Sequence, residues 1–194
     1  MTTATRQSRW LAALHTPVDA AALGIFRIVF GLAVAWDAWR YLAYGWVTEY
    51  YVRPVVHFTY FYLDWVQPWP GWGMYLHYWG MSLCALCVAA GLCYRVTSVL
   101  LCLTMGYVFL LEQSVYMNHH YLMLLVAGML AVMPAHRAYA VDRWRAPATP
   151  TTVGRWTVWL LRFQLCVVYA YGAVAKLNPD WLRGEPMYLS LIHI

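Results

Sequence analysis

The sequence predicts an all-α protein, a polytopic bundle of transmembrane helices, on two observations. Hydrophobic residues make up 63% of the 194 residues and charged residues only 11%, with a mean hydropathy of +0.52. A soluble domain carries about 25% charged residues, so this chain has too few charges to cover a surface that faces water. The second observation is a series of apolar runs, each close to the ~20 residues that cross a bilayer as a helix.

The apolar runs divide the chain into a polar lead-in and about five spans. The lead-in is residues 1–20. Between the first two spans, three prolines and many aromatic residues indicate an ordered loop at the membrane interface. The expected spans are residues 21–44, 73–93, 96–114, 119–137 and 156–176.

Lysine and arginine residues predict the orientation. With the N-terminus inside, seven of them lie on the inner side and three on the outer side. This excess favours an N-in, C-out topology. We therefore expect a multi-pass integral membrane protein with membrane lipid as a partner, in a bacterial inner membrane or in the endoplasmic reticulum of a eukaryote. No basic cluster is interleaved with aromatic residues, so nucleic acid is not an expected partner.

Polar side chains gather at the outer ends of the expected spans. Such groups are costly at membrane depth, so they usually face an interior cavity and mark function. We expect a polar site at the outer leaflet. The residues concerned are Arg53, His57, His77, Glu112, Asn118, His119, His120 and Lys176.

Helical spacing places some of these side chains on common faces. Lys176 lies seven residues after Tyr169, so both fall near one helix face. Glu112 and His119 are also seven apart and share a face if the third expected helix continues that far. Two helices would then direct a lysine and a Glu/His pair into one cavity. A cavity that is half apolar and half polar suits a quinone.

Several of these residues also have a structural interpretation. Asp37 and Arg40 are three residues apart and are expected to pair on one helix. His57 and His77 are expected to be interfacial rather than catalytic. Lys176 is either a lysine that snorkels to the water or a base whose charge is suppressed by burial.

Three ordered motifs resemble the membrane core of vitamin K-dependent gamma-glutamyl carboxylase and its microbial relatives. They are "GLCYRVTSVL", "YVFLLEQSVYMNHHYL" and "VVYAYGAVAKLNPDWLRGEPM", and "GIFRIVFGLAVAWDAWRYL" resembles the opening span of that family. The similarity runs from about Leu23 to Met187. It implies a carboxylase-like (HTTM) transmembrane domain over residues 21–188.

The resemblance implies a lyase/oxygenase type of activity. Enzymes of this family oxidise reduced vitamin K, a quinol, to its epoxide with dioxygen, and that oxidation drives carboxylation of glutamate side chains with carbon dioxide. The lysine of the family motif, the base, corresponds to Lys176, and the Asn-His pair corresponds to Asn118 and His119. Tyr169 and Glu112, which replaces an aspartate, complete the expected substrate-binding set. No metal is expected.

The C-terminal end departs from the family. The animal enzymes continue beyond the fifth span with a large lumenal region that binds protein substrates. Residues 189–194, "LSLIHI", read as a translated sequencing-library adapter. We therefore expect a fragment with a non-native tail that lacks a C-terminal lumenal or periplasmic region, and we expect any glutamate-bearing protein or peptide substrate on the outer side.

Whether the chain is an enzyme is left open by the sequence. The alternative is a non-enzymatic membrane module that binds a quinone, a lipid or a partner domain, and such a module should tolerate Lys176→Ala. A haem electron carrier is disfavoured, because His136 lies at the inner end of its span and His77 at the outer end of another.

Overall fold

The computed structural model describes residues 10–186 and 188 and consists mostly of α-helices, which confirms the predicted fold class. The chain divides into two compact units, Met1–Arg155 and Trp156–Ile194. Each unit is described here by itself.

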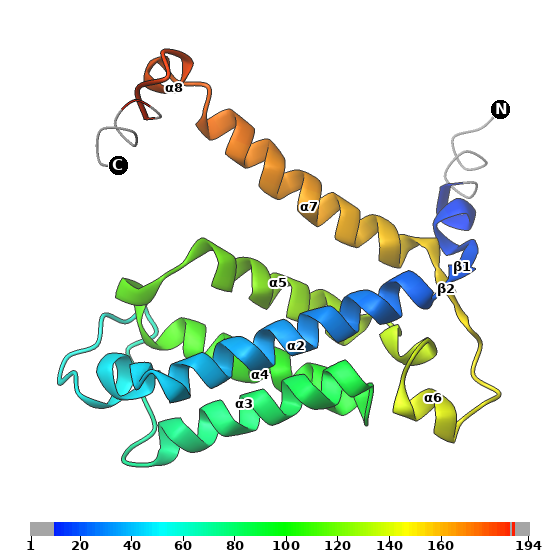
Figure 1. The fold of residues 1–194 in the computed structure, drawn as a ribbon, viewed down its shortest axis with the longest axis horizontal. Coiled ribbons are helices and arrows are strands. Elements are labelled where there is room, and N and C mark those ends of the chain that lie inside the picture. Colours follow the sequence, from blue (N-terminus) through cyan, green and yellow to red (C-terminus); the bar gives the residue numbers. More distant parts are fainter. Residues whose placement is uncertain (1–9, 187, 189–194) are drawn as a thin grey trace. The chain divides into compact units, whose positions relative to one another are not determined.

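The first unit is a bundle of four helices that occupy four of the five expected spans. Helices α2 and α3 pack side by side, and α4 packs against both α3 and α5 (Figure 1). Among the described residues, α2, α4 and α7 of the second unit are long and apolar enough to cross a membrane, and α5 is a shorter apolar helix. The bounds in the first unit are α2 Ala21–Ala43, α3 Gly73–Ala90, α4 Tyr94–Leu111 and α5 Asn118–Val132.

A close contact between α2 and α3 organises the bundle. A Cβ atom built on Gly31 of α2 would lie 2.7 Å from the carbonyl oxygen of Ala85 and 2.9 Å from the Cβ of Ala89 on α3. Small residues at a helix interface let the two backbones approach in this way, which increases van der Waals contact where no hydrophobic effect drives association.

A buried arginine near the start of α2 connects this helix to the neighbouring elements. Arg27 has no exposed surface. Its guanidinium donates to the carbonyl oxygens of Ala135 at 3.2 Å, Ala89 at 3.2 Å and Tyr139 at 2.7 Å. The left-handed residue Gly91, at φ +66°, ends α3 beside it, and any side chain there would collide with the guanidinium. Arg27 therefore has a structural role.

Short elements connect these helices. Strand β1 (Pro17–Asp19) pairs antiparallel with β2 (Thr152–Gly154), with Val18 opposite Val153. Helix α6 (Val141–Arg145) carries Asp142, whose carboxylate accepts from the backbone N–H groups of Cys93 at 2.9 Å and Tyr94 at 2.7 Å. These are donors that the first turn of α4 leaves without a helical partner.

The prediction that the third helix continues beyond residue 112 is wrong. Helix α4 ends at Leu111, and Glu112 is extended, with φ −146° and ψ 107°. The carboxylate of Glu112 instead caps a 3₁₀ turn, Gln113–Val115, by accepting from the N–H of Ser114. A new helix, α5, begins at Asn118, so Glu112 and His119 do not share a helix face.

The second unit contains the fifth expected span, α7 (Arg155–Ala175), and a short helix, α8 (Pro179–Leu182). Asn178 caps α8 by accepting from the N–H of Trp181 at 3.0 Å. Tyr169 lies on α7, and Lys176 follows its last residue. The expected non-native tail, residues 189–194, lies outside the described residues.

Candidate functional site

The first unit contains a partly open cavity of about 60 Å³, lined by residues of its four helices and of the segments after α2 and α4. Two carboxylates, a histidine and several phenols line it. Four methionines, at positions 81, 105, 117 and 123, form much of the apolar wall. Polar groups in an apolar cavity at membrane depth are typical of a functional site. The polar lining residues are Asp37, Tyr41, Tyr51, Tyr78, Glu112, Tyr116 and His120.

One side of the cavity holds a carboxylate–histidine pair across two helices. His120, in the first turn of α5, places its Nε2 3.1 Å from Oδ2 of Asp37 on α2. A carboxylate can only accept a hydrogen bond, so Nε2 carries the proton and donates. Arg40 lies 3.6 Å from the other oxygen of Asp37, which confirms the predicted pair of Asp37 and Arg40. The carboxylate of Asp37 therefore lies between the positive charge of Arg40 and the N–H donor of His120.

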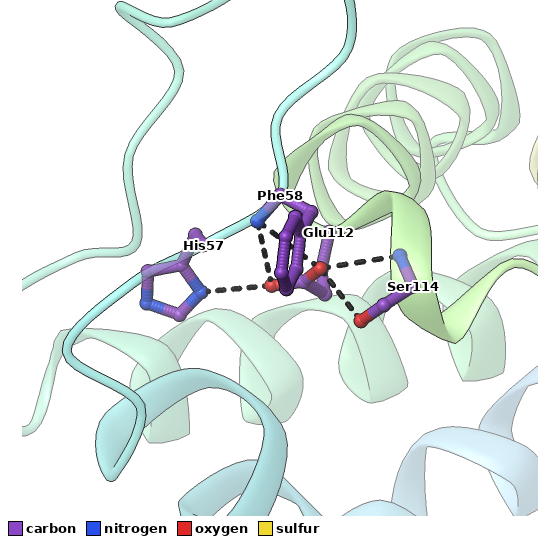
Figure 2. A network of polar contacts seen from close by, with 4 residues as sticks. All are labelled: His57, Phe58, Glu112 and Ser114. Atoms are coloured by element: carbon purple, nitrogen blue, oxygen red, sulfur yellow. Dashed lines mark hydrogen bonds and ion pairs between the residues drawn. The ribbon is translucent and has the colours of Figure 1, made fainter.

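The second carboxylate, Glu112, is saturated with donors (Figure 2). It accepts from Nδ1 of His57 at 3.1 Å, from the N–H of Phe58 at 3.3 Å, and from the N–H and Oγ of Ser114 at 3.1 and 2.7 Å. The carbonyl of Phe58 in turn accepts from the N–H of Gln113 at 2.8 Å. We call this arrangement the Glu112 latch, because it fastens the loop after α2 to the end of α4.

The hydrogen bonds of the latch lower the pKa of Glu112 and so favour its ionised form. Burial by itself would raise the pKa of this carboxyl, but the hydrogen bonds from Ser114, His57 and Phe58 outweigh burial and lower the pKa below its usual value. Glu112 is therefore an ionised, fully satisfied group, which suits it to hold the loop in place rather than to exchange protons.

Aromatic side chains surround the Asp37–His120 pair. The rings of Tyr41 and Tyr78 are stacked with centroids 5.2 Å apart, and Tyr41 lies 6.0 Å from the His120 ring. Tyr51, on the short π-helix Thr48–Val52, lies 6.0 Å from Tyr78. Burial raises the pKa of Tyr51 to about 12, so its phenol stays neutral and can donate a hydrogen bond.

The structure brings only part of the expected site together. Glu112 lines the cavity, whereas Asn118 and His119 are exposed at the start of α5 and are not among its lining residues. The ring of His119 lies 4.4 Å from that of His120. Sequence reasoning included both histidines in the polar site at the outer leaflet, but it selected His119 for substrate binding, and it did not select Asp37 as a site residue. The adjacent histidines point about 100° apart around a helix, and nothing in the sequence says which one faces inward.

Tyr169 and Lys176 belong to the second unit. The Nζ atom of Lys176 lies 5.0 Å from the ring centroid of Trp181 in α8, a cation–π geometry. Among the described residues, no carboxylate forms an ion pair with Lys176.

A helical bundle with apolar spans and a polar internal cavity defines the class of the molecule as a polytopic membrane protein. Within that class, residues 15–194 match the HTTM domain, and the chain belongs to this family. It is the membrane domain of the vitamin K-dependent carboxylase family. No solved structure shows a significant match to the chain.

Proposed function

We propose that this protein is a quinol oxidoreductase of the carboxylase family, which oxygenates reduced vitamin K or a related quinol to its epoxide. The observation that carries the proposal is the cavity of the first unit. It joins a carboxylate–histidine pair, neutral phenols and an apolar wall, and it does so in a chain of this family. A hydroxylated aromatic ring needs this combination, because its faces are apolar and its edge oxygens form hydrogen bonds.

The lining of the cavity matches the chemistry of such a ring, but the cavity must expand to hold it. A cavity of about 60 Å³ has room for about two water molecules, less than a fused two-ring quinol occupies. The four methionines of its wall are flexible side chains that repack readily around a guest. Binding therefore requires these side chains to move, and the polar groups keep their places.

The roles of the residues follow the family resemblance. Lys176 is the base that takes a proton from a ligand hydroxyl, as the corresponding lysine does in the family. By that resemblance alone, Asn118, His119 and Tyr169 are proposed to hydrogen-bond oxygens of the ligand; Asn118 and His119 lie at the start of α5 outside the lining of the cavity, and Tyr169 lies on α7. The Glu112 latch is proposed to hold the neighbouring loop. The quinol supplies the electrons for the reaction with dioxygen. Carboxylation of a glutamate substrate with carbon dioxide is the further step that this chemistry would drive.

A second candidate function is a non-enzymatic membrane module that binds a quinone, a lipid or a partner domain. The contact between Lys176 and the Trp181 ring favours it, because a cation–π contact stabilises a charged lysine, as in a side chain that anchors a helix at the interface. The two functions differ in their need for a lysine that can lose its proton.

Epoxide formation tests the proposal. Membranes that contain the protein are supplied with reduced vitamin K and dioxygen, and epoxide is measured for the unaltered protein and for Lys176→Ala, Lys176→Arg and Arg183→Ala. A base predicts that epoxide disappears in both Lys176 variants, because arginine keeps the charge but cannot deprotonate. Arg183→Ala, which removes a nearby exposed cation, should retain it.

The other outcomes are equally decisive. Epoxide that persists in Lys176→Arg would show that the lysine is an anchor and not the base. A folded protein without epoxide formation would overturn the enzymatic proposal and leave the binding module.

A further inference from the structure

The Asp37–His120 pair engages one ring nitrogen of a histidine that lines the cavity and leaves the other free to meet a ligand. Nε2 of His120 donates to Asp37, so a neutral imidazole carries its lone pair on Nδ1. Among the described residues, Nδ1 of His120 has no hydrogen-bond partner, whereas Nε2 is fully engaged. A carboxylate that binds a histidine in this way fixes the tautomer and the orientation of the ring.

The orientation of this pair is determined by α2. Arg40, one turn after Asp37, lies 3.6 Å from its carboxylate, and the guanidinium itself lies over the Trp46 ring at 5.1 Å. The ring of Tyr41 lies 6.0 Å from the imidazole. Two residues of α2, Asp37 by a hydrogen bond and Tyr41 by a ring contact, thus hold a histidine that comes from α5.

The other carboxylate of the cavity is a poorer acceptor of a new proton. Glu112 already accepts hydrogen bonds from His57, Phe58 and Ser114. A ligand hydroxyl would have to displace one of these donors to reach it. His120 needs no such displacement.

We propose that His120 is a proton-accepting residue of this cavity and that Asp37 is its positioning residue. The inference rests on the proposed function to the extent that the ligand is a hydroxylated aromatic ring. In the step, an O–H bond of the ligand breaks and its electron pair stays on the oxygen. The proton forms a new N–H bond at Nδ1, and the imidazolium is stabilised by the carboxylate of Asp37.

Nitrogen NMR tests the geometry without depending on turnover. The protein is labelled with ¹⁵N-histidine and purified in detergent, and the His120 signals are assigned with His120→Gln. We expect a single tautomer with a bare Nδ1 in the unaltered protein and a tautomer mixture in Asp37→Asn. A protonated Nδ1 at neutral pH in the unaltered protein would overturn the proposal.

Ligand addition tests the role. Reduced menadione, which carries two hydroxyl groups, should shift the Nδ1 signal through a hydrogen bond. Its dimethyl ether has the same ring without O–H groups and serves as the matched probe, which should leave the signal in place. Equal shifts with both probes, or none with reduced menadione, would overturn the assignment of His120 as the proton acceptor.

Kinetics complete the test. His120→Gln should lower kcat for epoxide formation by about 100-fold with little change in KM, since general-base catalysis contributes at least about that much. Asp37→Asn should lower it by about tenfold. The control is His77→Gln, because His77 binds the Thr104 carbonyl and does not line the cavity; it should stay within about twofold of the unaltered protein.

The two proposals fail in different ways. An unaltered protein that forms no epoxide contradicts the proposed function, and the NMR result with reduced menadione then decides the role of His120 by itself. If epoxide forms and His120→Gln retains a kcat within about threefold, the inference about His120 is wrong and the proposed function stands.

Discussion

The guanidinium of Arg27 donates a 2.7 Å hydrogen bond to the main-chain carbonyl of Tyr139, a residue 112 positions later in the chain. With the carbonyls of Ala89 and Ala135, this contact joins the start of α2 to the ends of α3 and α5. A charged residue within an apolar helix is therefore part of the scaffold here and not of the site.

Replacement of Arg27 should destabilise the bundle strongly. Arg27→Met keeps the approximate length of the side chain but removes the donor from three carbonyl oxygens, two of them in buried hydrogen bonds and the third in a half-buried one. We expect a loss of about 3 kcal/mol or more, from the net value of hydrogen bonds to a charged group. Thermal unfolding in detergent, followed by circular dichroism, measures it. Arg53→Met removes an exposed pair with Glu49 and should cost under about 1 kcal/mol; equal losses would contradict the structural role.

The contact at Gly31 predicts a steric effect. Gly31→Ala places a methyl group 2.7 Å from the Ala85 carbonyl oxygen, so α2 and α3 must separate, at a cost of about 1–3 kcal/mol. Gly80→Ala on α3 is the matched control, because a Cβ there meets no atom within 4 Å. The same unfolding measurement should show a loss for Gly31→Ala only. A stable Gly31→Ala protein would mean that the two helices are not in close contact.

The Glu112 latch predicts a response to acid. The folded-state pKa of Glu112 is lowered, so its contribution to stability is fully present above the pKa of the unfolded chain and is lost as the pH falls through the folded-state value. Amide hydrogen exchange at Phe58 and Ser114, corrected for its intrinsic pH dependence, should therefore lose protection on acidification. Glu112→Gln should be poorly protected at every pH, whereas Glu49→Gln should behave as the unaltered protein. If the protection of these amides in the unaltered protein did not change with pH, the latch would be refuted.

The capping carboxylate of Asp142 predicts a smaller effect. Asp142→Ala leaves the N–H groups of Cys93 and Tyr94 without their acceptor, and we expect a loss of about 1 kcal/mol. Asp142→Asn retains one side-chain oxygen and should lose less. Asp64→Ala, in an exposed loop, provides the comparison by thermal unfolding. A loss for Asp64→Ala as large as for Asp142→Ala would argue against a cap.

Local patterns in the sequence predicted the helices well and their ends less well. Five apolar runs became helices because hydrophobic runs of span length have few alternatives in a membrane. The end of α4 was missed, because Glu112 leaves the helix to accept hydrogen bonds from a turn and from a loop far away in the chain. The expected end at residue 137 was too late, since Pro134 follows α5 and its ring disfavours helix in the preceding residue.

The sequence by itself determined that this chain is a mostly helical membrane protein and that Asp37 and Arg40 pair, and it predicted that polar residues gather near one end of the spans. These properties depend on composition and on the period of one helix, which neighbouring residues specify. Only the tertiary structure decided that His120 rather than His119 lines the cavity, that Asp37 holds it, and that Glu112 is bound by His57. These pairs join residues more than 50 positions apart, and the packing of whole helices selects them, because helix rotation fixes which side chains meet.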